Sequence, residues 1–501
     1  LSAICMLGIA IGAIAIVFSL VEAMLLRPLP FRAPSDLVVI AQHFANQNLH
    51  EVPFSAAEVQ DFRTAIKGLE DAAAYRHTEF NVGTDDSVER IIGAAVTPNL
   101  FDVLGVAPLL GRTFDASDAG RDIPAAVIGE RLWRRQFAAD SAIEGKEIRL
   151  SGQPYTVIGI MPAEFRFPLP RFNVRGPAPG TADVWTLARI STGEMSRRSV
   201  RTFHVIGRVG NGSGLANLTR DLKRVSEDWT QRFPNSYGAG FGLTAQSLRE
   251  DVAGRIKPAL WILAAAVVAV LFIALFNLTA ILIARGIGRT GEFALRIALG
   301  AGRIRLARQL ITEGLLLAGL ATAAGLVLGA IVLPLLRSGA ADATPLIIDA
   351  QVNGSVLLCV LAAAIASGVC LGVVPAFAIA FGSPAAALQN RPRNFIRVTR
   401  WHRVRDVLVI GEIALGVVLL FFAVSLNQDL ARLRRAALGF NAVGVVTMEA
   451  SLAPAKYPDH PAIAGYFTAA AQRTRAIPGV EAAAFVSVLP LSGVNQDRSF
   501  T

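Results

Sequence analysis

Residues 271–320 read LFIALFNLTAILIARGIGRTGEFALRIALGAGRIRLARQLITEGLLLAGL and contain two apolar stretches joined by a short basic turn. Each apolar stretch, with its flanks, is long enough for a membrane helix, which needs roughly 20 residues. The turn has a single acid, Glu292, and loops rich in arginine stay on the cytoplasmic side of a membrane. The sequence therefore predicts a membrane hairpin whose turn lies in the cytoplasm. The arginines of the turn are Arg285, Arg289, Arg296, Arg303, Arg305 and Arg308.

Five stretches of the chain are long and apolar enough to cross a bilayer. A second basic loop, residues 383–405, carries six arginines and no acid, whereas residues 337–353 carry one arginine and two aspartates. This charge asymmetry predicts spans that alternate in direction, with the first running outward. Residues 30–257 then lie outside, which in a bacterial cell means the periplasm or the outer face of the membrane. The predicted spans are residues 3–26, 258–284, 307–336, 354–381 and 407–426.

The composition is typical of a membrane protein with a large water-exposed part. Hydrophobic residues make up 53% of the chain and charged residues 17%, and the mean hydropathy is +0.48. The net charge of +10 does not require a nucleic-acid partner, because twelve arginines lie in the two basic loops, where topology explains them. The cysteines, Cys5, Cys359 and Cys370, all lie in apolar spans, so we expect no disulfide in the external region.

The external region has the alternating patterns of a folded α+β domain. Ser55 precedes Glu58 by three residues, which is the spacing of a helix capping box, and Val59, Phe62, Ile66 and Leu69 then share one helical face. We therefore predict a helix in this segment.

Further along, the text EIRLSGQPYTVIGIMP, residues 147–162, predicts a β-hairpin turning at residues 151–154. A second helical pattern covers residues 215–233, and the strand-like FGLTAQSL, residues 241–248, follows it. Roughly 220 residues correspond to one large domain or two small ones.

The chain also contains an internal repeat. AIKGLEDAAAY, residues 65–75, is echoed by AIPGVEAAAF, residues 476–485, and GIAIG, residues 8–12, is echoed more faintly by EIALG, residues 412–416. The order of span, strand and helix therefore starts again. Because the chain starts inside an apolar run and stops in mid-pattern, we expect both ends to be truncated and a second external domain to be cut off at Thr501.

Several separated motifs resemble the FtsX and MacB type of ABC-transporter permease. The hairpin text FNLTAILIARGIGRTGEFALRIALGAGRIRLARQLITEGLLLA is similar to that family's permease pattern. The external region resembles the MacB periplasmic core domain through LLRPLPF at Leu25, VTPNLFDVLGVAPLLGRTF at Val96, IRLSGQPYTVIGIMPAEFRFP at Ile148 and DVWT at Asp183. The partial second copy makes the chain most similar to the duplicated orphan permeases, in which two such units are fused.

The resemblance implies a fold of FtsX-like membrane helices plus an α+β extracytoplasmic MacB-like domain. It implies a permease that moves or acts on envelope or efflux substrates, with ATP hydrolysis supplied by a separate protein. A multi-pass location in the bacterial inner membrane follows. The implied partners are a P-loop ATPase, a periplasmic adaptor or partner protein, the lipid bilayer, and a second unit in a homodimer or a pseudo-dimer of repeats.

In the family, the segment equivalent to the hairpin turn is the coupling element that the ATPase touches. Carried over to this chain, it comprises Gly291, Glu292, Arg296, Gly300 and Arg303, and the family's Arg-Glu pair reads Gly291-Glu292 here. A short amphipathic piece at the membrane face has the character to contact a cytoplasmic partner. The alternative is that the arginines only set the topology and bind anionic headgroups. The sequence leaves both interpretations open.

Glycines spaced four apart recur in three spans, and such spacing permits close approach of helices. The simpler interpretation is that these glycines let the spans pack against one another. The more specific interpretation is that they form the interface of a dimer or pseudo-dimer. The glycines are Gly8, Gly12, Gly325, Gly329, Gly368 and Gly372.

Past the fifth span, Leu426, Leu430, Leu433 and Ala437 form one stripe, so we expect the helix to continue as an amphipathic stalk. The predicted division of the chain is residues 1–29, first membrane helix; 30–257, MacB-like core domain; 258–382, three-helix permease domain; 383–406, basic cytoplasmic linker; 407–438, second-repeat helix and stalk; 439–501, start of a second core domain.

Motifs of catalysis are absent from the sequence. It has no G-x-x-x-x-G-K-[ST] for nucleotide phosphates and no H-E-x-x-H or cysteine pair for a metal. The glycine-rich GNGSG, residues 210–214, lacks the lysine of a phosphate loop and is interpreted as a turn. We therefore expect no enzyme activity, no cofactor and no metal. The alternative to a permease is a non-transporting envelope scaffold or signalling protein that binds a periplasmic partner.

Overall fold

The computed structural model separates the chain into two compact units, one formed by residues 1–27 and 256–447 and the other by residues 28–255 and 448–501. The structure describes residues 2–66, 68–84, 87–120, 124–168, 181–210, 214–254, 256–288, 292, 295–296, 299, 302–340, 350–380, 395–435, 444–448, 450, 452, 457 and 459–486.

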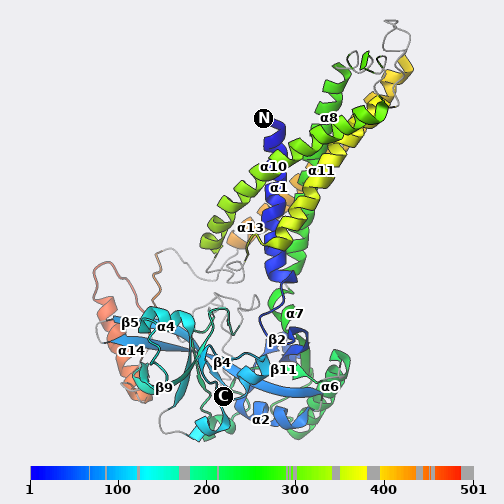
Figure 1. The fold of residues 1–501 in the computed structure, drawn as a ribbon. Helices are drawn as coiled ribbons and strands as arrows, with labels where there is room; N and C mark the ends of the chain where they lie inside the picture. The colour runs from blue at the N-terminus through cyan, green and yellow to red at the C-terminus, as the bar shows by residue number, and fades with distance from the viewer. Residues whose placement is uncertain are drawn as a thin grey trace. The chain divides into compact units, whose positions relative to one another are not determined.

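The first unit consists of long apolar helices (Figure 1). Within the described residues, five helices are long and apolar enough to cross a membrane. Helix α1 contacts α8, α10 and α11, α10 contacts α11, and α8 contacts both α11 and α13. The helices are α1 (Ser2–Val21) with the π-helical turn η1 (Glu22–Leu26), α8 (Lys257–Gly288), α10 (Arg303–Ala340), α11 (Gly354–Ala380) and α13 (Phe395–Arg435).

Helix α13 differs from the sequence prediction at its start. It begins at Phe395, so residues 395–406 of the predicted basic linker are helical. Arginine is a good helix former, and no proline lies between Phe395 and the apolar span that continues the same helix. The predicted stalk is helical as far as Arg435, with Leu426 and Leu430 exposed; Ala437 lies outside the described residues.

The second unit is built on one mixed sheet, which contains twelve strands in the described part of the chain. The strand order is β12-β1-β11-β4-β5-β10-β7-β9-β6, with β2 on β1, β3 on β11 and β8 on β9. Pairs β5–β10 and β7–β9 are parallel, and the other pairs are antiparallel. The strands are β1 (Leu37–Phe44), β2 (Leu49–Val52), β3 (Phe54–Ser55), β4 (Leu69–Thr84), β5 (Ser87–Val96), β6 (Leu110–Gly111), β7 (Ala125–Gly129), β8 (Glu147–Leu150), β9 (Gln153–Met161), β10 (Val184–Leu187), β11 (Arg201–Val209) and β12 (Phe241–Ser247).

Two hydrophobic cores hold helices on this sheet. Helices α2 and α6 pack on the strands around β11, where Phe62, Trp229 and Phe203 are buried together. Helix α4 packs on β7, β8 and β9 through Leu132 and Trp133. Figure 1 shows α6 at the end of the sheet that carries β11 and α4 at the end that carries β9. The helices and 3₁₀ turns of this unit are η2 (Pro34–Asp36), η3 (Ala45–Gln47), α2 (Ala56–Ala65), α3 (Leu100–Leu104), η4 (Ala116–Gly120), α4 (Glu130–Phe137), α5 (Thr192–Met195), α6 (Leu215–Arg232), α7 (Leu248–Ala253) and α14 (His460–Arg475).

This architecture confirms the predicted fold class of membrane-type helices plus an α+β domain. The predicted β-hairpin is formed by β8 and β9, which pair antiparallel around Ser151 and Gly152, both in the left-handed region. The predicted helix before it begins at the Ser55 capping box but ends at Ala65. Leu69, expected on that helical face, instead begins strand β4. Gly68 lies just before it, and glycine in this position favours a break over a continued helix.

The predicted repeat has a partial counterpart. Helix α14 precedes residues 476–485 as α2 precedes residues 65–75. Residues 69–75 form the start of β4, whereas residues 480–486 are described without strand pairing. Internal duplication therefore stays a prediction.

Candidate functional site

The turn between α8 and α10 carries a chain of polar contacts. Arg296 Nη2 lies 2.5 Å from Glu292 Oε1, one helical turn earlier, and Arg296 Nη1 donates to Gln309 Oε1 at 3.3 Å. Gln309 Nε2 then donates to Glu313 Oε1 at 3.1 Å. These contacts connect the turn to the first three turns of α10.

The same turn exposes apolar side chains beside its arginines. Leu295, Leu299 and Ile304 are exposed, with Leu299 at 80%. Arg305 and Arg308 are exposed at the start of α10. An exposed surface of mixed apolar and cationic side chains suits either a protein partner or the headgroup region of a bilayer.

The other predicted residues of this turn are only partly described. Arg303 is the first residue of α10, and Arg285 is exposed near the end of α8. Gly291 and Gly300 lie outside the described residues. The structure therefore brings Glu292 and Arg296 together and does not test the predicted five-residue segment as a whole.

Helices α1 and α10 meet at glycines. A Cβ atom on Gly12 would lie 2.9 Å from the carbonyl oxygen of Gly325, and one on Gly8 would lie 3.1 Å from that of Ala321. Gly325 in turn faces the backbone of Gly8 and Gly12. The helix backbones touch here because no side chain separates them.

Helices α10 and α11 meet in the same way. A Cβ on Gly314 would lie 2.5 Å from Gly368 O, and one on Gly368 would lie 2.9 Å from the Cα of Leu315. A Cβ on Gly372 would overlap Ile311. Gly329, in contrast, has room for a Cβ, 3.7 Å from the Cβ of Ala15.

Sequence reasoning missed Gly314, because no glycine lies four residues from it. A usable signal was present, since Gly314 precedes Gly325 by eleven residues, about three helical turns. The two glycines therefore share one side of α10, and α11 and α1 approach that side at successive levels.

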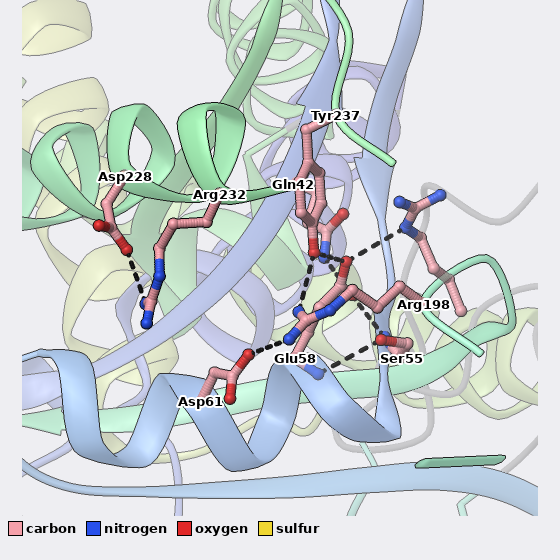
Figure 2. Close-up of polar contacts among 9 residues, drawn as sticks. Gln42, Ser55, Glu58, Asp61, Arg198, Asp228, Arg232 and Tyr237 are labelled. Atoms are coloured by element: carbon pink, nitrogen blue, oxygen red, sulfur yellow. Dashed lines mark hydrogen bonds and ion pairs between the residues drawn. The ribbon is translucent and has the colours of Figure 1, made fainter. Parts of the chain in front are cut away.

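The external unit has a buried carboxylate that sequence reasoning treated only as a helix cap. Glu58 is 0% exposed at the start of α2. Its Oε2 accepts from Ser55 N at 2.6 Å and from Gln42 Nε2 at 2.7 Å, and its Oε1 accepts from Tyr237 Oη at 2.5 Å. Figure 2 shows these groups converging on Glu58 from three separate segments.

Arginines surround this cluster. Arg201 Nε lies 3.6 Å from Glu58 Oε1, and Arg198 pairs with Asp61 and donates to Tyr237 Oη at 3.3 Å. Burial, then the nearby Glu58 charge, raises the pKa of the Tyr237 hydroxyl well above its usual range. A second ion pair, Arg232 with Asp228 at 3.1 Å, lies on α6 (Figure 2).

Through these contacts the Glu58 cluster connects α2, β1 and the segment after α6. Both carboxylate oxygens of Glu58 accept hydrogen bonds from protein groups, so this buried carboxylate is placed as a structural acceptor and not as a general base. Among the described residues, no group of three histidine, cysteine or acidic side chains is placed to hold a metal ion.

Comparison with known proteins identifies two family models in the chain. The MacB-like periplasmic core domain matches residues 2–225, and the FtsX-like permease C-terminal domain matches residues 264–384. Together these ranges span more than half of the chain. No curated protein matches.

Three solved structures resemble the chain in part. A domain of a permease protein from Porphyromonas gingivalis is 14% identical with a TM-score of 0.35, and it covers 44% of this chain and 92% of its own. The extracellular domain of the ABC-type transporter YknZ from Gram-positive bacteria is 13% identical (TM-score 0.30; 42% and 99% covered). The periplasmic region of MacB from Actinobacillus actinomycetemcomitans is 10% identical (TM-score 0.31; 46% and 94% covered).

Proposed function

The chain belongs to the FtsX/MacB type of ABC-transporter permease, and from this premise we propose that ATP hydrolysis on a separate protein moves its membrane helices and, through them, its external domain. The external domain then moves an envelope or efflux substrate, or activates a partner outside. This action needs no path for the substrate through the bilayer. The chain itself supplies no catalysis in this proposal.

One observation carries the proposal: within the first unit, a continuous series of contacts leads from the hairpin turn to α1, the helix whose chain continues into the external region. Arg296 and Gln309 connect the turn to α10. Helix α10 meets α1 backbone to backbone at Gly325 and Gly12. The chain continues from α1 through η1 into residues 28–36, and in this proposal a displacement of α10 is transmitted to α1 and then along this covalent connection.

The remaining parts of the proposal follow from the family and from the charge pattern. We place the chain as a multi-pass protein in the bacterial inner membrane, with the turn in the cytoplasm and residues 30–257 in the periplasm or outside. A periplasmic adaptor, and a homodimer or pseudo-dimer, are further proposed partners. The domain division predicted from the sequence is retained as part of this proposal.

Co-purification tests the ATPase partner. The full chain, extracted in mild detergent from its native host, is expected to retain a P-loop ATPase. The double variant Leu299→Asp with Arg296→Ala is expected to lose it, because the change removes the apolar and cationic contacts of the turn. Arg432→Ala, which removes an exposed arginine of α13 outside the turn, is the control and is expected to retain the ATPase.

Two results would count against this proposal. Absence of any ATPase from the wild-type pull-down would favour the scaffold or signalling alternative. Retention of the ATPase by the double variant would instead favour an arginine turn that only sets topology and binds headgroups. Repeating the pull-down in nanodiscs with and without anionic lipid distinguishes ATPase binding by the turn from headgroup binding by the turn, because only headgroup binding depends on that lipid.

A further inference from the structure

A buried arginine in the external unit is bound by backbone carbonyls, and its nearest acidic charges are those of Glu70 and Asp36. Arg208 lies on β11 with only 4% of its surface exposed. Among the described residues, no carboxylate lies within ion-pair distance of its guanidinium. Burial, together with the like charge of Arg32, lowers the pKa of Arg208. A buried cation is costly unless its donors are satisfied, so the residue needs a structural explanation.

The guanidinium binds backbone carbonyls of two separate segments. Its Nε and Nη2 donate to Val103 O at 3.0 and 2.7 Å. Its Nη2 also donates to Arg32 O at 2.7 Å, and its Nη1 donates to Ala33 O at 3.3 Å. Val103 lies in the last turn of α3, where backbone carbonyls have no partner within the helix and are free to accept these bonds.

Arg32 and Ala33 belong to the stretch that connects the first membrane helix to the sheet, residues 28–36, which we call the incoming segment. Arg32 N donates to Leu104 O at 3.2 Å. Gly105 has a φ of +67°, and a Cβ on it would overlap that of Arg32. The incoming segment therefore lies directly on the backbone that ends α3.

An aromatic cluster holds the incoming segment from a second direction. Phe31 is buried, and its ring meets Phe165 and Phe167 edge-on, with centroids 6.4 and 6.3 Å apart. Tyr75 and Trp185 extend this cluster, because Tyr75 packs on Phe167 and Trp185 on Phe165. Phe31 is thus anchored to β4 and β10 while Arg208 anchors the next two residues to β11.

The chain leaves the sheet beside the place where it arrives. Helix α7, which precedes the second membrane helix, contacts η2 of the incoming segment and also β1 and β12. Strands β12, β1 and β11 are neighbours in the sheet. Both connections to the membrane helices are therefore fixed on three adjacent strands.

We propose that Arg208 is a positioning residue that locks the incoming segment to β11, so that the segment and the sheet move as one body. Burying an apolar side chain of similar size would cost less free energy than burying this charge. It would not hold three carbonyl groups, however, whereas the five donors of a guanidinium form a rigid fork. This proposal rests on the proposed function only in that the segment then transmits motion from α1.

Hydrogen exchange of the full chain in nanodiscs tests the lock. In Arg208→Met, amide protection in peptides covering residues 28–36 and 100–106 is expected to fall about tenfold or more, because lost bonds to a charged donor open these segments locally. Protection in β7 is expected to stay unchanged. Arg208→Lys keeps the charge but has fewer donors, so an intermediate loss is expected. Arg90→Met, an exposed sheet arginine, is the matched control.

The outcomes are distinct. Unchanged amide protection of the incoming segment in Arg208→Met would overturn the proposal. An equal loss of protection over the whole sheet would also overturn it, because Arg208 would then stabilise the core in general and not the incoming segment in particular. If Arg208→Met does not fold, Arg208→Lys decides by the same criterion. The exchange experiment contains no ATPase, so absence of an ATPase from the pull-down would refute the proposed function and leave the lock standing.

Discussion

Gly314→Ala is expected to destabilise the helix bundle because its Cβ would meet backbone rather than a side chain. The Cβ would lie 2.5 Å from Gly368 O and 3.0 Å from Gly372 N. Ordinary contact requires roughly 3.4 Å, so α10 and α11 must separate by about 1 Å, which also loosens neighbouring contacts. Overpacking of this kind costs about 1–3 kcal/mol.

Gly319→Ala is the matched control on the same helix. A Cβ on Gly319 has nothing within 4 Å, so only the helix preference of alanine remains, which is worth up to about 1 kcal/mol in favour of the variant. The two variants make the same chemical change, so the helix preference of alanine is common to both and cancels, and they are expected to differ by the overpacking cost of about 1–3 kcal/mol in unfolding free energy.

The assay is thermal unfolding of the full chain in mild detergent, followed as the fraction that stays monodisperse after heating. Gly314→Ala is expected to unfold several degrees below wild type, and Gly319→Ala at or above it. Equal midpoints for the two variants would refute the reasoning, because backbone contact between α10 and α11 would then carry no energy.

Two further predictions concern the external unit and the topology. The raised pKa of Tyr237 means that its contribution to stability is fully present below the unfolded value of about 10 and is lost as pH rises above it. Tyr237→Phe is therefore expected to lower the unfolding free energy by about 1–3 kcal/mol at pH 7, because Glu58 loses one hydrogen-bond donor. The variant is also expected to lose less stability than wild type above pH 10. Denaturant unfolding from pH 7 to 11 measures both effects, and an equally steep decline in the two proteins would contradict the assignment. In a background without native cysteines, Ser117→Cys is expected to react with an impermeant maleimide once the outer membrane is opened, and Gly302→Cys only after the inner membrane is disrupted; the reverse order would contradict the proposed topology.

Features with short-range signals were predictable from the sequence. The Ser55–Glu58 capping box is present with both of its hydrogen bonds, and the β8–β9 hairpin forms where the strand-like runs flank residues 151–152. Long apolar runs located the membrane-type helices. The error at Leu69 arose because an apolar residue spaced at helical period also fits the first position of a strand.

The sites depended on contacts between residues far apart in the chain. Glu58 was recognised as a cap, but its partner Tyr237 lies 179 residues away, and no local pattern connects them. Gly314 lacks a glycine four residues away, so its role depends on where α11 crosses α10. Both facts require the assembled structure.

The sequence by itself determined the membrane-type helices, the cytoplasmic turn as a hypothesis, and the α+β character of the external region, because these follow from apolar period and charge within short windows. Only the tertiary structure decided which glycines face a backbone and why Arg208 is buried. A side chain's environment is set by segments that chain folding brings together, and no local pattern in the sequence connects Val103 with Arg208, which are 105 positions apart.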